Sequence, residues 1–194
     1  DLEKLKKLHA DGVRAIALTW NFANCFGFPN SSDKEIMQKG LTAFGKEAVG
    51  EMNRLGMLVD VSHLSDGGIY DVAKISQKPF IASHSNCREV TNHSRNLTDE
   101  MIRILAEKGG VSGLNFCPEF TGPNKQTVRN LADHVMHMFK VGGEDFPALG
   151  TDFDGIHGDM ELEHPEQMGL LFHELAKRGL SERQIEKFAY KNVL

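Results

Sequence analysis

The fold is decided by the stretch MLVDVSHLSDGGIYDVAKISQKPFIASHSN, residues 57–86, which contains two apolar runs that each lead into a Ser-His pair. Between the runs lies a segment with helical spacing of apolar residues, and it begins at Ser65, a residue type that caps helix N-termini. Strand, helix, strand is the order of a βαβ unit, whose parallel strands end at the same edge of a sheet. We therefore expect His63 and His84 on one face of the fold.

The same alternation extends along the whole chain. The strand-like apolar segments are residues 13–20, 57–62, 79–83, 111–116 and 146–153. Each is followed by one or more segments with helical periodicity. Their nearly continuous apolar composition indicates strands buried on both faces, as in a parallel sheet. The sequence therefore predicts an α/β fold, either a doubly wound open sheet or a (β/α)₈ barrel.

Two features favour the barrel. There is no Gly-x-Gly-x-x-Gly or phosphate-binding loop after any predicted strand, and polar residues follow several different strands, as in barrel enzymes. A full (β/α)₈ TIM barrel has ~250 residues, so this chain of 194 residues would supply about five βα units. We expect residues 1–194 to form a single domain, the C-terminal portion of a barrel whose N-terminal strands and C-terminal tail are absent from this chain.

The composition bounds the class of function. A net charge of −5 and the lack of a basic stripe argue against a nucleic-acid partner. No apolar run reaches the roughly 18 residues that a membrane span needs. The three cysteines form no Cys-x-x-Cys pair and no disulfide framework, which favours a reducing compartment and a cytoplasmic location.

Side chains with metal-binding chemistry follow three of the predicted strands. A single histidine at a strand end is more often a hydrogen-bonded structural residue than a ligand. Two histidines at equivalent positions, with an aspartate after a later strand, favour a site for zinc or a similar divalent ion. We predict His63, His84 and Asp152 as ligands. Asp154 would face the same way only if its segment stays extended, and its role is open between site and structure.

Other polar residues give weaker signals. Arg95 lies in a polar loop after His84 and could bind a carboxylate with its bidentate fork, although a plain surface arginine fits the pattern equally well. His134 and His137, three residues apart on a predicted helix, could hold a metal. The outer helices of a barrel lie far from its active face, so solvent-facing or capping roles are expected for both. No cysteine has a base partner that would make it a nucleophile.

At these residues the sequence resembles the renal (membrane) dipeptidase family of zinc metallopeptidases, and its bacterial-type members in particular. The matching stretches, in family order, are AIALTWNFAN, TAFGKEAVGEMNRLGMLVDVSHLS, PFIASHSNCREVTNHSRNLTDE, GGVSGLNF, LGTDFDGI and LLFHELAKRGLSERQIEKFAYKN. They cover nearly the whole chain. The resemblance implies a (β/α)₈ barrel with two Zn²⁺ ions bridged by a glutamate. It also implies hydrolysis of dipeptides, often with a D-residue at the C-terminal position, through a hydroxide that bridges the metals.

The resemblance also implies roles for individual residues. His63 and His84 match the two histidines of one zinc. Asp152 matches the aspartate that contacts the other zinc and carries the proton in catalysis. Arg95 matches the arginine that binds the terminal carboxylate of the dipeptide.

The chain departs from the family pattern in two places. Trp20 and Asn21 stand where some members carry a substrate-contacting histidine, and we expect both to contact substrate. The family's His-x-Asp pair and its bridging glutamate have no counterpart here, so the chain offers three of the expected ligands. A different barrel amidohydrolase (a deaminase or lactonase) and an inactive truncated chain are the alternatives. A homodimer is the expected assembly.

Overall fold

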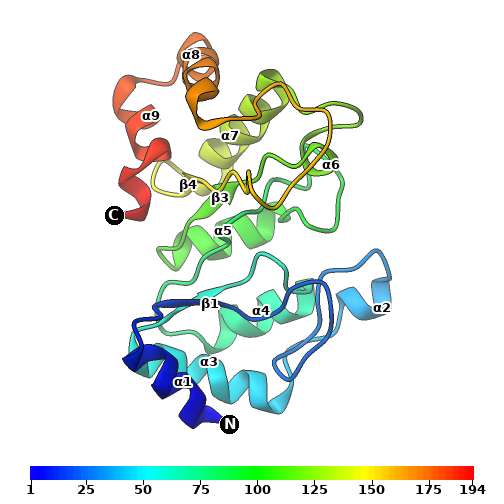
Figure 1. Cartoon of the computed structure of the whole chain (residues 1–194), viewed down its shortest axis with the longest axis vertical. Helices are drawn as coiled ribbons and strands as arrows, with labels where there is room; N and C mark the ends of the chain where they lie inside the picture. Colours follow the sequence, from blue (N-terminus) through cyan, green and yellow to red (C-terminus); the bar gives the residue numbers. More distant parts are fainter. The chain divides into compact units, whose positions relative to one another are not determined.

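The computed structural model describes all residues from 1 to 194, and the chain divides into two compact units, Asp1–Ala82 and Ser83–Leu194. In each unit short parallel strands alternate with helices (Figure 1). The fold is therefore α/β of the TIM-barrel type, as predicted; four named strands and the bridged segment at residues 79–83 account for about five βα units.

The first unit contains two named strands and four helices. Its elements are α1 (Leu2–Ala10), β1 (Ala15–Ala17), α2 (Lys34–Met37), α3 (Ala43–Leu55), β2 (Leu58–Asp60) and α4 (Asp66–Ile75). Strands β1 and β2 pair in parallel, with Ala15 opposite Leu58 and Ala17 opposite Asp60. A further parallel bridge joins Asp60 to Ile81, which lies in the third predicted strand.

Local sequence signals explain where these helices begin and end. Ser65 caps the N-terminus of α4, as predicted, because its hydroxyl accepts a hydrogen bond from the backbone N–H of Gly68 at 3.2 Å. Thr42 caps α3 in the same way, and α3 ends at Gly56, whose φ of 72° is the left-handed conformation that glycine adopts without strain. The left-handed conformation of Gly56 therefore ends α3 and leads the chain into β2.

The second unit contains the remaining strands and helices. Its elements are α5 (Asp99–Glu107), β3 (Ser112–Leu114), α6 (Pro118–Thr121), α7 (Val128–Gly142), β4 (Pro147–Leu149), the 3₁₀ turn η1 (Pro165–Gln167), α8 (Met168–Lys177), α9 (Glu182–Ala189) and the 3₁₀ turn η2 (Lys191–Val193). Strands β3 and β4 pair in parallel, with Ser112 opposite Pro147 and Leu114 opposite Leu149. The segment that begins at Ser83 runs along β3, because the Ser85 N–H donates to the carbonyl of Gly113 at 2.8 Å.

Two glycines allow these three backbone segments to approach closely. A Cβ atom on Gly113 would lie 2.0 Å from the Ser83 carbonyl oxygen and 2.8 Å from the Cα atom of Gly150. A Cβ atom on Gly150 would also lie 2.0 Å from the Ser83 oxygen. Any side chain at either position would separate the strands. The segment at residues 79–83, which was predicted to be a strand, pairs through isolated bridges and backbone hydrogen bonds and does not form a named strand.

The core of the second unit is closed by α5, α7, α8 and α9. Its largest fully buried side chains include Phe116, Phe146, Phe188 and Leu131. Burial of each such side chain contributes roughly 1.5–3 kcal/mol to folding.

His134 corrects one expectation from the sequence. It lies on the inner face of α7 and is fully buried, so the solvent-facing role expected for it is wrong. Its Nδ1 accepts a hydrogen bond from the Cys87 N–H at 3.2 Å, which places the ring proton on Nε2, 3.3 Å from the Thr91 hydroxyl oxygen. His137 instead pairs with Asp99 at 2.6 Å and joins α7 to α5. Helical periodicity indicates where the apolar face of α7 lies, but it does not indicate that His134 lies on this face with Leu131 and its apolar neighbours.

We expect His134 to make the second unit sensitive to acid. Burial lowers the pKa of His134 from its ordinary value of 6.5 to about 4. The unfolded chain therefore binds the proton first as the pH falls, so stability that is fully present above pH 6.5 is lost between pH 6.5 and pH 4. The loss over this window is about 3 kcal/mol. Urea unfolding at pH 7.0 and pH 4.0 measures it.

The matched variant is His134→Gln, which cannot titrate and should flatten this part of the pH profile, although its overall stability is lower. The same replacement at His173, an exposed histidine on α8, controls for the loss of a histidine. Equal slopes for the wild type and His134→Gln would contradict the assignment.

Candidate active site

Asp152 lies just after β4 in an unusual backbone conformation. Its φ is 61°, and no other non-glycine residue of the chain has a positive φ. A turn follows, in which the Gly155 N–H donates to the Asp152 carbonyl at 2.9 Å. Aspartate tolerates the left-handed region better than most residues, and such conformations concentrate at functional sites. Because this segment is turned, the extended geometry that would place Asp154 beside Asp152 is not formed, and Asp154 is exposed.

Two buried asparagines support the Asp152 side chain. Asn115 follows β3, and its side-chain N–H donates to Oδ2 of Asp152 at 3.1 Å. Asn86 is held against Asn115 by two further bonds, since its Oδ1 accepts from the Asn115 N–H at 2.8 Å and its Nδ2 donates to the Asn115 carbonyl at 2.9 Å. Both asparagines are fully buried. The carboxyl ends of three neighbouring segments are thus joined by amide hydrogen bonds.

Arg95 lies in the loop that follows His84, and only 7% of its surface is exposed. Its guanidinium lies 5.4 Å from the centre of the Phe120 ring, and its terminal nitrogens lie 3.5 Å from the Ser85 hydroxyl and 3.4 Å from the His84 carbonyl. These contacts are long for charge-assisted hydrogen bonds, which are ordinarily ~2.7–2.9 Å. The protein positions the guanidinium over Phe120 and beside the Ser85 hydroxyl and the His84 carbonyl.

His93 also contacts Arg95 and Phe120. Its ring stacks on Phe120 with the centroids 4.6 Å apart, and its Nδ1 accepts from the Arg95 backbone N–H at 3.1 Å. Burial lowers the pKa of His93, and the neighbouring Arg95 and Arg88 add to this effect, whereas Glu119 opposes it. His93 is thus kept neutral beside the guanidinium.

His84 begins the loop that carries Arg95. Its Nδ1 lies 2.7 Å from the Ser83 hydroxyl oxygen, which orients the imidazole ring.

Cys117, which lies two residues after Asn115, has a raised pKa because it is half-buried, so its thiol stays protonated at neutral pH.

The first unit holds the other predicted site residues. His63 follows β2, and its carbonyl accepts bonds from the Thr19 hydroxyl at 3.0 Å and from the Asn30 N–H at 2.9 Å, which fix the backbone at this strand end. Trp20 and Asn21 follow β1. Trp20 is 63% exposed and packs edge-to-face against Phe22 at 6.1 Å. Asn21 is exposed.

The predicted residues therefore divide between the two units. The second unit brings together the ends of the segments that carry His84, Arg95 and Asp152, whereas His63 and Trp20 belong to the first unit. The sequence interpretation gave no role to Asn86, Asn115 or Phe120. The two asparagines were visible as polar residues at strand ends, whereas nothing in the local sequence indicated that Phe120 lies beneath Arg95.

The residues of this chain provide only some of the donor groups that a metal site needs. Imidazole and carboxylate donors are the ligand types that zinc prefers, and both follow neighbouring segments of the second unit as His84 and Asp152. Neither unit alone contains a group of three or more histidine, cysteine, aspartate or glutamate side chains arranged to hold a metal ion. His84 and Asp152 thus offer donor types that fit a part of such a site.

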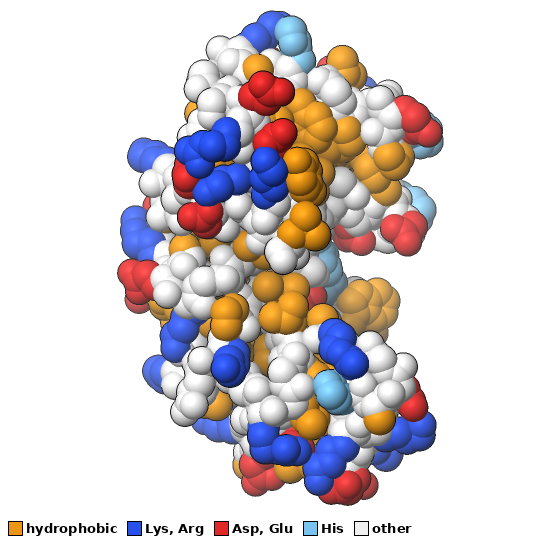
Figure 2. Space-filling view, turned by 90° about the vertical axis from the view of Figure 1, so that its left-hand side faces the viewer, with side chains coloured by type: hydrophobic (Ala, Val, Ile, Leu, Met, Phe, Trp, Pro, Cys, Tyr) orange, Lys and Arg blue, Asp and Glu red, His pale blue; other side chains and the backbone are white.

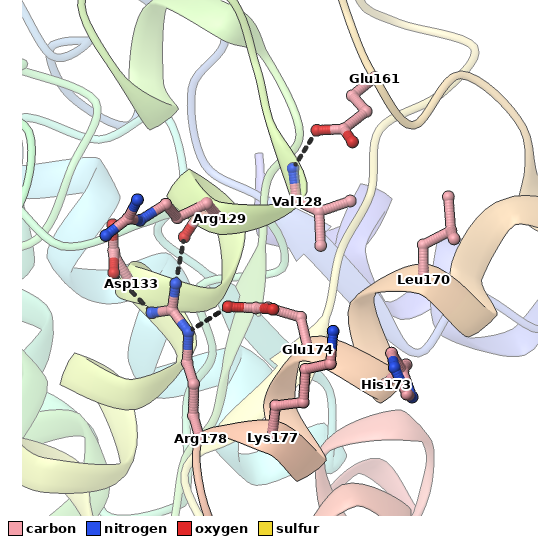
Figure 3. Close-up of a pocket in the computed structure, with 9 residues that line it drawn as sticks. All are labelled: Val128, Arg129, Asp133, Glu161, Leu170, His173, Glu174, Lys177 and Arg178. Carbon is pink, nitrogen blue, oxygen red and sulfur yellow. Dashed lines mark hydrogen bonds and ion pairs between the residues drawn. The ribbon is translucent and has the colours of Figure 1, made fainter.

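A cavity of about 740 Å³ between α7 and α8 contains none of the predicted site residues (Figure 3). Arg178 crosses its wall and donates to Asp133 at 2.5 Å, to Glu174 at 2.8 Å and to the Arg129 carbonyl at 3.2 Å. These ion pairs satisfy the guanidinium and connect the two helices. We therefore assign the charged wall of this cavity to the packing of α8 on α7.

The molecular surface agrees with the charge pattern of the sequence. Acidic and basic side chains are interspersed on the face that Figure 2 shows. No helix has the length and apolar character that crossing a membrane requires.

Comparison with known proteins places the chain in a family. The model of the membrane dipeptidase family, peptidase family M19, matches residues 1–194. The chain is 38% identical over 199 residues to an uncharacterized dipeptidase of Schizosaccharomyces pombe, a match that covers 100% of this chain and 48% of that protein. It is 37% identical over 191 residues to the dipeptidase verJ of Clonostachys rogersoniana, with 98% and 49% covered.

A solved structure gives the same result. The metallopeptidase of Rhodobacter sphaeroides, bound to a phosphinate mimic of the dipeptide L-Ala-D-Ala, aligns with a TM-score of 0.90 at 30% identity, over 98% of this chain and 56% of that one. The chain thus spans about half the length of these relatives. Because the family model matches its whole length, the chain belongs to the membrane dipeptidase family of metallopeptidases.

Proposed function

We propose that the protein containing this chain is a zinc-dependent dipeptidase that hydrolyses the peptide bond of dipeptides with a free C-terminal carboxylate. The observation that carries the proposal is the placement of Arg95, a nearly buried arginine at the carboxyl ends of parallel strands. A guanidinium in a site of low dielectric binds a carboxylate through two parallel N–H···O bonds. Such a contact favours substrates whose terminal carboxylate lies one residue from the scissile bond.

The proton transfers are assigned to Asp152. Its carboxylate would accept a proton from the attacking water and deliver it to the amine that leaves, which is general base and then general acid catalysis. His63, His84 and Asp152 are the proposed metal ligands of this chain, and they would contribute to a site for two zinc ions together with further donors. Bound zinc supplies Lewis-acid polarisation of the scissile carbonyl and lowers the pKa of water.

Two further features concern the substrate. Trp20 and Asn21 are proposed to contact it, and their exposure after β1 leaves them accessible. Activity on dipeptides with a C-terminal D-residue is also proposed, supported by the L-Ala-D-Ala mimic bound to the Rhodobacter sphaeroides relative. Three predictions of the sequence stay untested: a single barrel domain that includes residues 1–194, a homodimer and a cytoplasmic location.

A substrate panel tests the proposed function. The full-length protein with added Zn²⁺ should hydrolyse L-Ala-L-Ala and L-Ala-D-Ala, and amidation of the C-terminus should reduce kcat/KM by about 100-fold or more, because Arg95 then faces a neutral group. Tripeptides should be poor substrates. Equal rates on free and amidated dipeptides would contradict the role of Arg95. Turnover of a lactone or an aminated base, with none of any dipeptide, would favour another amidohydrolase.

A further inference from the structure

Asn115 contacts Asp152 with one end of its amide group and the protein backbone with the other. Its Oδ1 accepts a bond from the Cys117 N–H at 2.6 Å, and its Nδ2 donates to Asp152 Oδ2 at 3.1 Å. A backbone N–H can only donate, so the oxygen of the amide must face Cys117 and the nitrogen must face Asp152. The direction of the bond to the carboxylate is therefore fixed by the backbone.

The backbone of Asn115 is fixed as well. Asn86 bonds both the N–H and the carbonyl of Asn115, at 2.8 and 2.9 Å. Both side chains are fully buried, where a polar network with all its members bonded is rigid. The donor that meets Asp152 thus cannot move without breaking several buried hydrogen bonds.

Gly155 defines the other side of the carboxylate. A Cβ atom on Gly155 would lie 2.4 Å from Asp152 Oδ1 and 3.2 Å from its Cγ. The three atoms nearest to such a Cβ all belong to Asp152. The missing side chain at position 155 leaves the space that the Asp152 carboxylate occupies.

We propose that Asn115 and Gly155 are positioning residues that together fix the carboxylate of Asp152: Asn115 holds Oδ2 by a directed N–H bond, and Gly155 leaves room for Oδ1. This inference rests on the proposed function, because it gives Asp152 a catalytic role. A misplacement of ~1 Å at a reacting group costs on the order of 100-fold in rate. Neither positioning residue contacts the substrate in this account.

Two variants test the two halves of the proposal. Asn115→Asp keeps the oxygen that meets the Cys117 N–H and replaces the N–H that meets Asp152 with an oxygen, which repels the carboxylate. Gly155→Ala pushes the carboxylate from the opposite side. In the full-length protein, each variant should lower kcat for L-Ala-D-Ala about 100-fold, while KM changes by less than about threefold. Crystal structures of both variants should show the Asp152 carboxylate displaced.

The chain offers a matched control for each variant. Gln126 is also a fully buried amide, whose oxygen accepts from the Leu162 N–H at 3.1 Å and whose nitrogen donates to the Leu162 carbonyl at 3.2 Å. Gln126→Glu therefore makes the same chemical change away from Asp152. A Cβ atom on Gly40 would lie 2.2 Å from Asp71 Oδ2, so Gly40→Ala displaces a different carboxylate. Both controls should keep kcat within about twofold of the wild type.

The outcomes separate this inference from the proposed function. If Asp152→Asn is inactive while Asn115→Asp and Gly155→Ala keep wild-type kcat, the positioning role is wrong and the proposed function stands. If Asp152→Asn keeps full activity, the catalytic role of Asp152 fails and the inference fails with it. If Asn115→Asp does not fold, Gly155→Ala decides, because the two atoms nearest to its new methyl group are Oδ1 and Cγ of Asp152. A loss of kcat in the controls equal to that in the variants would also overturn the proposal.

Discussion

Asp152→Asn should lower kcat for dipeptide hydrolysis by 10²- to 10⁴-fold, the range typical for removal of a general acid–base group. The amide keeps the shape of the side chain but cannot accept the proton from water. Its Oδ1 can still accept the bond from Asn115, so the fold should be retained. Steady-state kinetics on L-Ala-D-Ala and a thermal unfolding curve measure the two effects separately.

Asp154→Asn is the matched control. The two aspartates are two residues apart, but Asp154 is exposed and lies beyond the turned backbone of Asp152. We expect kcat of this variant to stay within about twofold of the wild type, because surface substitutions of this kind have small effects. Equal losses in both variants would mean that the turn as a whole is required, and would remove the specific role of Asp152.

Arg95→Ala should raise KM for dipeptides so that kcat/KM falls by roughly 10²- to 10³-fold, which corresponds to the loss of a buried charge-assisted contact. The effect should be small on C-terminally amidated dipeptides, because these lack the carboxylate. Arg95→Lys should restore little, since an ammonium cannot form the bidentate pair and does not stack on Phe120 in the same way. Kinetics on the free and the amidated substrates measure the difference.

Arg103→Ala provides a control for the loss of an arginine. Arg103 lies on α5, and 57% of its side chain is exposed, where it pairs with Asp99. Its removal should leave kcat/KM unchanged within about twofold. Equal effects of Arg95→Ala on free and amidated dipeptides would show that Arg95 supports the loop and does not bind the carboxylate.

Local signals predicted the parts of the fold that depend on short segments. The apolar run at the start of residues 57–86 and the cap at Ser65 each determine structure within a few residues, and both are confirmed. Strand ends were less predictable. The apolar run at residues 146–153 predicts one strand, but the strand β4 ends at Leu149 and Asp152, in the left-handed conformation, follows soon after. Aspartate seldom adopts this conformation, so the sequence alone did not indicate it.

The supports of the candidate site depend on pairs of residues far apart in the chain. Asn115 and Asp152 are separated by 37 positions, and Cys87 and His134 by 47. Helical or strand periodicity shows which residues are apolar but not which polar side chain meets which partner. The expectation that His134 faces solvent or caps a helix rests on the distance of the outer barrel helices from the active face, and the sequence assigns no role to Asn115. The predictions of His63, His84, Arg95 and Asp152 as site residues came from their strand-end positions and the family resemblance, and they stay predictions.

The most direct test of the account is a crystal structure of the full-length protein with Zn²⁺ and a phosphinate mimic of L-Ala-D-Ala. The account predicts that the carboxylate of the mimic lies within hydrogen-bond distance of both terminal nitrogens of Arg95. It also predicts that His63, His84 and Asp152 coordinate zinc, and that Asn115 still donates to the Asp152 carboxylate. A mimic bound elsewhere, or zinc bound without these three residues, would contradict it.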